Sequence, residues 1–195
     1  MARTAGRSPE ETRRVLLGAA AEVFRDRGVS ATLADVARGA GVSKGGLLYH
    51  FATKDDLVRA LVQDMLDTFR ADVTAAVDPD DTGPGRLTRA YVRVSLRAHD
   101  ADEVRETAAL IAQLAAIPEV AALAKSDARH WAATLAADGL PPTVLALVVS
   151  AADGASFAAL WGGASHTLPA HDLERGLLRL TRDRDLWALL APSQG

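Results

Sequence analysis

The chain has 195 residues, of which 49% are hydrophobic, and it carries a net charge of -3 and no cysteine. This length allows one large or two small domains, with ample apolar material for a buried core. The lack of cysteine excludes disulfides, thiolate metal sites and cysteine nucleophiles.

The charge is distributed unevenly. Residues 1–60 carry ten Lys/Arg against seven Asp/Glu, whereas residues 61–195 carry twelve against eighteen. A nucleic-acid partner would be attracted to the positive end. The first residues, MARTAGRSPEE, are basic but no apolar run follows them, so we expect a basic arm rather than a signal peptide, and a cytoplasmic location.

The first predicted helix opens at a proline. Ser8, Pro9 and Glu11 have the spacing of an N-cap, a first-turn proline and a capping-box acid. An apolar face follows and ends near Gly28, so this helix should pack across the next two. The face consists of Leu16, Ala20, Val23 and Phe24.

Two short amphipathic helices follow around a glycine turn. Thr32 and Asp35 have the capping-box spacing that begins a helix, and Gly41 is placed to end it with a positive φ. Ser43 can cap the second helix, with Val42 before it at the position of a hydrophobic staple. The apolar stripe of the first helix is Leu33, Val36, Ala37 and Ala40.

The second of these helices contains Gly45 and Gly46, each of which disfavours helix by roughly 1 kcal/mol relative to alanine. Small side chains would let its N-terminus press against phosphates and base edges. A flexible Gly-Gly loop is the alternative, but the cap and the apolar periodicity argue against it. Four nearby side chains can reach phosphate oxygens: Lys44, Tyr49, His50 and Lys54.

These residues resemble the helix-turn-helix of the TetR family of bacterial transcriptional regulators. The resemblance covers about a quarter of the chain and departs at Leu48, where the family usually has tyrosine, with Tyr49 next to it. Leu48 therefore either packs or has lost a contact. The matching residues are Thr32, Val36, Ala37, Ala40, Gly41, Val42, Ser43, Gly45, Leu47, His50, Phe51, Thr53, Lys54, Asp55 and Leu57.

The resemblance implies an all-α protein that binds double-stranded DNA as a homodimer. Residues 1–54 would form a three-helix DNA-binding domain, and residues 55–195 a helical domain for effector binding and dimerisation. Two recognition helices would then meet major grooves about 34 to 36 Å apart on a palindromic operator. We expect base edges at Ser43, Lys44, Gly45 and Gly46, and phosphates at Thr32, Tyr49, His50 and Lys54.

Beyond the motif the pattern predicts helices only. Thr53 and Asp56 form another capping pair, which opens a helix that runs towards Val77. The segment DPDDTGPG at 78–85 predicts a linker. No strand pattern appears, and Pro and Gly residues delimit helices at about 86–99, 102–116, 119–138, 142–162 and 170–190.

The helix expected at 142–162 is almost apolar enough to span a bilayer, but Asp153 near its middle argues against a membrane anchor. A helix that is apolar nearly all round is instead buried on several sides. Resemblance to the family implies that 142–162 and 170–190 pair with their symmetry mates as a four-helix bundle, so we expect a homodimer and no membrane.

The effector should be a small molecule, and the apolar character of the middle helices favours an apolar or aromatic one. Ordinary core packing is the alternative for each candidate side chain. No histidine has metal-ligand spacing, so we expect neither a metal nor a cofactor. The candidate pocket residues are Met65, Phe69, Leu96, Leu110, Gln113, Leu114, Trp131, Phe157 and Trp161.

Three alternatives stand beside a ligand-released repressor. An enzyme is not expected, because the chain has no glycine-rich phosphate loop, no Gly-x-Ser-x-Gly elbow and no metal-binding cluster. A helical ligand-binding or interaction protein with weakened DNA binding is the second, with Leu48 as its support. A transcriptional activator also fits the motif.

Overall fold

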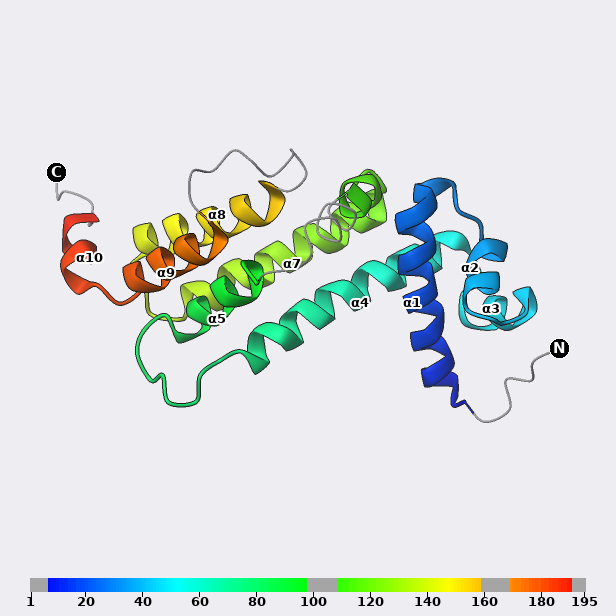
Figure 1. Ribbon diagram of the computed structural model, residues 1–195, viewed down its shortest axis with the longest axis horizontal. Helices are drawn as coiled ribbons and strands as arrows, with labels where there is room; N and C mark the ends of the chain where they lie inside the picture. The colour runs from blue at the N-terminus through cyan, green and yellow to red at the C-terminus, as the bar shows by residue number, and fades with distance from the viewer. Residues whose placement is uncertain (1–6, 98–108, 159–168, 191–195) are drawn as a thin grey trace. The chain divides into compact units, whose positions relative to one another are not determined.

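The computed structural model describes residues 7–97, 109–158 and 169–190, with side chains up to residue 156 in the second range. These residues form helices joined by turns, with no strand among them, so the all-α prediction is confirmed. The chain divides into two compact units (Figure 1). One comprises residues 1–67 and 106–125, and the other residues 68–105 and 126–195.

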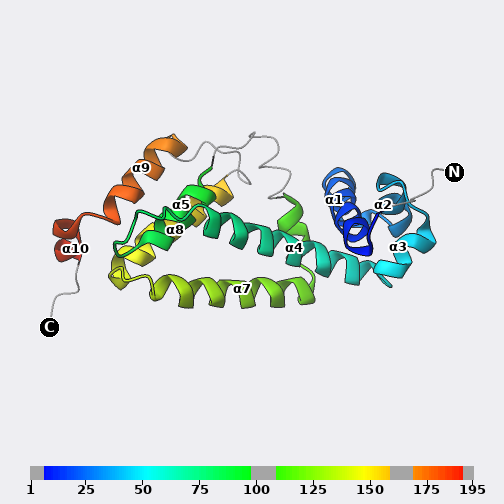
Figure 2. The ribbon, with the colours of Figure 1, turned by 90° about the horizontal axis from the view of Figure 1, so that it is seen from below.

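The first unit is built around α1, which packs on α2, while α2 packs on α3 (Figure 2). The elements are α1 (Pro9–Arg27), the 3-10 turn η1 (Gly28–Ser30), α2 (Leu33–Gly39), α3 (Lys44–His50) and the first half of α4 (Lys54–Ala75).

Local caps set the starts of these helices as predicted. The Ser8 hydroxyl accepts from the Glu11 N–H at 3.1 Å, and the Glu11 carboxylate accepts from the Ser8 N–H at 2.6 Å. The Thr53 hydroxyl likewise accepts from the Asp56 N–H at 3.0 Å at the start of α4. Gly28, with φ 62°, ends α1.

One apolar core holds the first unit together, and all its helices contribute to it. A helical stretch at 109–114 closes this core through Leu110 and Leu114. Complete burial of such side chains supplies about 1.5 to 3 kcal/mol each. The most deeply buried members are Leu16, Ala20, Phe24, Val36, Leu47, Leu57 and Leu114.

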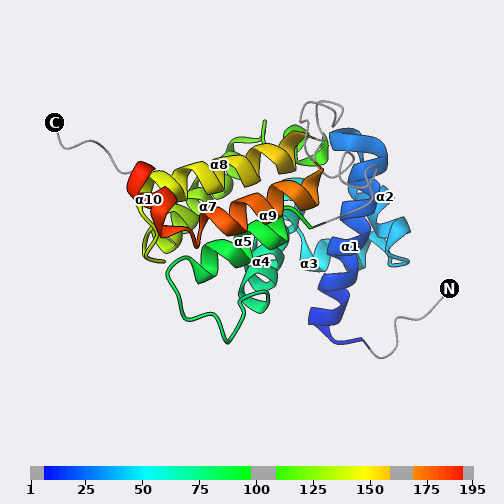
Figure 3. The same cartoon turned by 60° about the vertical axis from the view of Figure 1, so that its left-hand side comes forward.

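In the second unit, α5, α8 and α9 lie against one another (Figure 3). Their shared core includes Val92 of α5, Val148 of α8 and Leu177 of α9. The elements are the rest of α4, α5 (Arg86–Ser95), the later part of α7 (Pro118–Ala136), α8 (Pro142–Ala158), α9 (Ala170–Leu180) and α10 (Arg184–Leu190).

The prediction of one helix over 170–190 is wrong, because the chain turns at 181–183. The Thr181 hydroxyl donates to the Leu178 carbonyl at 2.7 Å, and the Asp183 carboxylate accepts from the Leu186 N–H at 3.1 Å at the start of α10. The Trp187 indole N–H donates to the Leu180 carbonyl at 2.7 Å and holds the bend. The helix expected at 86–99 also ends early, at Ser95.

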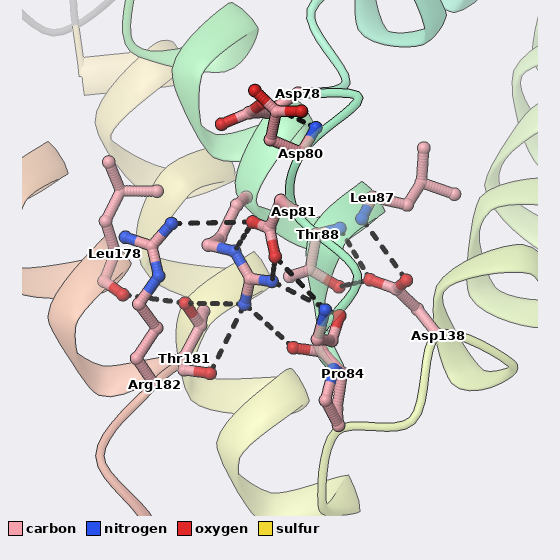
Figure 4. Close-up of polar contacts among 12 residues, drawn as sticks. Asp78, Asp80, Asp81, Pro84, Leu87, Thr88, Asp138, Leu178, Thr181 and Arg182 are labelled. Carbon is pink, nitrogen blue, oxygen red and sulfur yellow. Dashed lines mark hydrogen bonds and ion pairs between the residues drawn. The ribbon is translucent and has the colours of Figure 1, made fainter.

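The loop at 78–85 is folded around the buried side chain of Arg89, which is 1% exposed. Figure 4 labels its partners Asp81, Pro84 and Thr181. The Arg89 guanidinium makes a two-pronged ion pair with Asp81, with both N–O distances at 2.6 Å. It also donates to the Pro84 carbonyl at 2.8 Å and to Thr181 after α9 at 3.4 Å. The predicted linker is thus a closed loop attached to α5 and α9.

The start of α5 takes its cap from a distant carboxylate. Gly85 at its N-cap has no side chain to accept from the first N–H groups, and its φ of 82° suits glycine. Asp138, which follows α7, accepts instead from the N–H of Leu87 at 3.2 Å and of Thr88 at 2.7 Å. The Thr88 hydroxyl donates to the same carboxylate at 2.8 Å.

Candidate functional site

The start of α2 is fixed by the predicted capping box. The Thr32 hydroxyl accepts from the Asp35 N–H at 3.2 Å and donates to the Asp35 carboxylate at 2.6 Å. The hydroxyl and the backbone N–H of Thr32 lower the pKa of Asp35 to about 2, with help from Arg27 and Arg38. Asp35 is therefore ionised, and the hydroxyl predicted to hold a phosphate already has a partner within the chain.

The turn between α2 and α3 has the backbone that the sequence predicts. Gly41 has φ 67°, and the Val42 N–H donates to the Ala37 carbonyl at 3.0 Å. The Ser43 hydroxyl then accepts from the Gly46 N–H at 3.0 Å and begins α3. Val42 and Leu47 both pack into the core of the first unit.

The two glycines of α3 differ in their surroundings. A Cβ on Gly46 would lie 3.3 Å from the Ser43 hydroxyl oxygen and would crowd the cap, whereas a Cβ on Gly45 would meet that oxygen only at 4.0 Å. Gly45 is exposed and could carry a methyl group within its own chain. Internal packing therefore explains glycine at 46 but does not explain it at 45.

The opposite face of α3 turns away from the core and presents polar groups to solvent. Lys44 is exposed and Tyr49 is 81% exposed, while the half-buried His50 ring meets the Tyr49 ring edge-on at 5.2 Å. Leu48 is 39% exposed beside Tyr49 and makes no core contact of the kind that Leu47 makes.

Lys54, expected to clamp a phosphate, is half-buried and linked to the chain itself. Its ammonium donates to the Val29 carbonyl in η1 and lies 5.7 Å from the centre of the Phe24 ring. It thereby joins the start of α4 to the end of α1. A phosphate bound by Lys54 would have to share the ammonium group with the Val29 carbonyl or replace that carbonyl as its partner.

The candidate pocket residues do not gather at one place. Met65, Leu110 and Leu114 pack in the core of the first unit, and Leu96 packs against α8 in the second. Gln113 is exposed, and its side-chain oxygen accepts from the Val29 N–H at 3.3 Å. Trp161 and the side chain of Phe157 lie outside the described residues.

Phe69 and Trp131 are brought together, and Tyr91 completes a cluster of three rings. The ring centres are 5.5 Å apart for Phe69 and Tyr91, 5.7 Å for Phe69 and Trp131, and 5.0 Å for Tyr91 and Trp131. All three pairs are edge-to-face, as aromatic side chains prefer. Trp131 is buried, and its indole N–H has no hydrogen-bond partner among the described residues.

Tyr91 and Asp153 are residues that the sequence did not mark as a site. The Tyr91 hydroxyl donates to the Asp153 carboxylate at 2.7 Å. Burial raises the pKa of both groups, and the hydrogen bond from Tyr91 partly offsets the rise for Asp153. The available signal was the position of Asp153, a carboxylate inside an otherwise apolar helix.

Among residues 7–97, 109–158 and 169–190, no three His, Asp or Glu side chains come together as metal ligands. None of the helices traced there has the length and apolar character needed to cross a membrane.

The family comparison matches both parts of the chain. Residues 16–61 match the model described as bacterial regulatory proteins of the tetR family, and residues 85–182 match the tetracyclin repressor-like C-terminal domain. The chain belongs to the TetR family of bacterial transcriptional regulators. As expected, this is a family of regulators and not of enzymes.

Curated TetR relatives align over part of their length. The transcriptional regulator TtgR of Pseudomonas putida is 36% identical over 85 residues, 43% of this chain and 40% of that protein. The repressor KstR2 of Rhodococcus jostii is 32% identical over 116 residues, 54% of this chain and 55% of that protein. The alignments thus span about half or less of these relatives.

Solved TetR-like structures match nearly the whole chain. A transcriptional regulator from Rhodococcus sp. Rha1 has a TM-score of 0.66 at 25% identity and covers 91% of this chain and 95% of its own. The multidrug binding protein EbrR, solved with malachite green, has a TM-score of 0.65 at 27% identity and covers 88% of this chain and 98% of its own.

Proposed function

We propose that this TetR-family protein is a ligand-responsive repressor that binds a palindromic operator as a homodimer and is released by a small molecule. Residues 1–54 would bind the DNA, with Ser43 to Gly46 at base edges and Thr32, Tyr49, His50 and Lys54 at phosphates. Residues 55–195 would bind the effector and the second subunit.

Gly45 is the observation that carries the proposal. It is exposed, it costs helix stability, and no described neighbour in the first unit requires it. A surface that another backbone must approach closely would require it, as at a helix that enters the major groove. The capped turn and the exposed Lys44 and Tyr49 beside it fit such a surface.

Gly45→Ala separates the effect of this glycine on helix stability from its effect on DNA binding. Alanine should raise the free energy of unfolding by up to about 1 kcal/mol, because it restricts the unfolded chain and favours helix. It should also weaken DNA binding at least tenfold, measured by gel shift on a duplex selected by the wild-type protein from a random library.

Gly18→Ala is the matched control. Gly18 is an exposed glycine of α1, and a Cβ there would meet nothing within 4 Å. It should stabilise the protein similarly and leave DNA binding unchanged. Equal DNA affinity for Gly45→Ala and the wild type would remove the main support for the proposal. Failure to select any duplex would favour the interaction protein with weakened DNA binding that the exposed Leu48 also allows.

Lys44 and Lys54 provide a second test of the proposed DNA interface. Replacing Lys54 should weaken binding to all sequences and reduce the salt slope by about one, whereas replacing Lys44 should change sequence preference. Because Lys54 also holds the Val29 carbonyl, a thermal melt must accompany its measurement. An unchanged salt slope for Lys54→Met would contradict its phosphate role.

Dimerisation is proposed for the surfaces of α8 and α9. Leu147 on α8 is 47% exposed, and a Cβ on Gly154 or Gly176 would meet no described neighbour within 4 Å, so a second helix could approach closely there. Sedimentation should give a dimer for the wild type and a shift towards monomer for Leu147→Glu. A monomeric wild type would contradict this part of the proposal.

The effector is proposed to be apolar or aromatic. EbrR was solved with malachite green and with ethidium, and KstR2 of Mycobacterium tuberculosis is described as a ketosteroid regulator. In this chain the rings of Phe69, Tyr91 and Trp131 form a cluster that would contact an aromatic ligand. A ligand at this place should abolish the gel shift.

A further inference from the structure

The ring cluster of the second unit is incomplete within the described residues. Trp131 is 9% exposed, and its indole N–H meets no acceptor among them. Buried polar groups are satisfied in the large majority of cases, so an unmet donor of this kind needs an explanation. It marks a position where a group from outside these residues belongs.

Asp153 gives the same cluster an uncompensated charge. Its carboxylate is half-buried on α8 and accepts from the Tyr91 hydroxyl at 2.7 Å, but no described Arg, Lys or His forms an ion pair with it. Arg70 pairs with Asp127 instead. A desolvated carboxylate without a counter-charge is unfavourable, and a positive ligand would relieve that cost.

The rings favour the same sign of charge. The face of an aromatic ring is electron-rich and attracts cations within about 6 Å of its centre. Phe69, Tyr91 and Trp131 stand edge-to-face to one another, next to the carboxylate that Tyr91 binds. An anion would be repelled by Asp153, and a neutral molecule would leave its charge uncompensated.

We propose that the effector is an organic cation with an aromatic or apolar body, whose positive charge lies beside Asp153 and whose body packs on the rings of Tyr91, Trp131 and Phe69. This narrows the effector class of the proposed function and rests on it. It also selects Phe69 and Trp131 from the candidate residues of the sequence, and it adds Tyr91 and Asp153.

Tetraphenylphosphonium and tetraphenylborate test the charge preference, because they have nearly the same size and shape and opposite charge. Titration calorimetry on the full chain should show at least tenfold tighter binding of the phosphonium. Asp153→Asn, which keeps the size of the side chain and an acceptor for Tyr91, should weaken phosphonium binding at least tenfold. It should also abolish the preference over the borate.

Asp72→Asn is the matched control. Asp72 lies on α4 in the same unit, is 45% exposed and pairs with Arg97, so its loss should leave both affinities unchanged. A wild type without preference for the phosphonium would overturn the proposal. So would an Asp153→Asn variant that melts like the wild type and binds the phosphonium equally well.

The gel shift distinguishes this failure from failure of the proposed function. A protein that binds its selected duplex but shows no charge preference refutes the cationic effector only. A protein that prefers the phosphonium through Asp153 but selects no duplex refutes the DNA-binding role only.

Discussion

Two polar clusters in the second unit begin two residues apart on α5 and differ in how their hydrogen bonds are met. Arg89 is buried with a two-pronged partner in Asp81 and with carbonyls of the 78–85 loop around it (Figure 4). Tyr91 joins Asp153 and the Trp131 ring, where an indole N–H and a carboxylate charge remain unmatched among the described residues.

The difference separates a structural role from a binding role. A buried charge that is fully paired within the chain holds its neighbours in one arrangement, here the loop, α5 and the end of α9. A buried group left unpaired lowers stability and needs an explanation, of which a bound water, ion or ligand is one. By this criterion Arg89 is structural, and the Tyr91 cluster fits the binding site proposed above.

The largest contrast should come from one substitution made in both clusters. Asp81→Asn would leave Arg89 buried without its counter-charge and should lower the free energy of unfolding by about 3 to 5 kcal/mol. Asp153→Asn removes a half-buried charge and should leave this free energy equal or higher. Urea unfolding measures both, and equal losses would show that the clusters do not differ as argued.

Tyr91→Phe should have an intermediate effect. The change deletes the only described donor to the Asp153 carboxylate and should cost about 1 to 3 kcal/mol of unfolding free energy. In an Asp153→Asn background the loss should be smaller, because no charge then needs the hydroxyl. A double-mutant cycle measures this coupling, and strict additivity would mean that the bond contributes nothing to stability.

The two units also differ in how much of them the sequence reveals. The helix starts at Ser8, Thr32, Ser43 and Thr53 depend on partners three residues away, so spacing alone predicted them. The bend at 181–183 was missed because its bonds are equally local but lie in a continuous amphipathic pattern, which periodicity extends into one helix.

The spacing of residues in the sequence does not predict contacts between distant segments. Asp138 caps α5 from 50 residues away, and Tyr91 finds Asp153 at a separation of 62. The helix-turn-helix could therefore be placed residue by residue, whereas the ring cluster needed the packing of α4, α5, α7 and α8. Only Phe69 and Trp131 of its members were among the candidates from the sequence.

Asp138→Ala tests the cap at the start of α5 and should have a smaller effect on the free energy of unfolding. Loss of the carboxylate leaves the N–H groups of Leu87 and Thr88 without their cap and should cost about 1 kcal/mol, the usual value for a helix N-cap. Asp78→Ala is a suitable control, since among the described residues that exposed carboxylate accepts only from the Asp80 N–H in the loop. Equal losses for the two would argue against the capping role.

The smallest effect, and the most direct comparison of the clusters, is the pH dependence of stability. Arg89 holds the pKa of Asp81 below its usual 3.8, so the advantage of the wild type over Asp81→Asn should be full above pH 3.8 and should fall as the pH drops through the lowered pKa. Burial raises the pKa of Asp153, so its folded form binds a proton more tightly than its unfolded form. The wild type should therefore gain stability relative to Asp153→Asn as the pH falls from the raised pKa towards 3.8. Urea unfolding between pH 3 and 7 measures both differences, and slopes of the same sign would mean that one of the two carboxylates has been assigned the wrong environment.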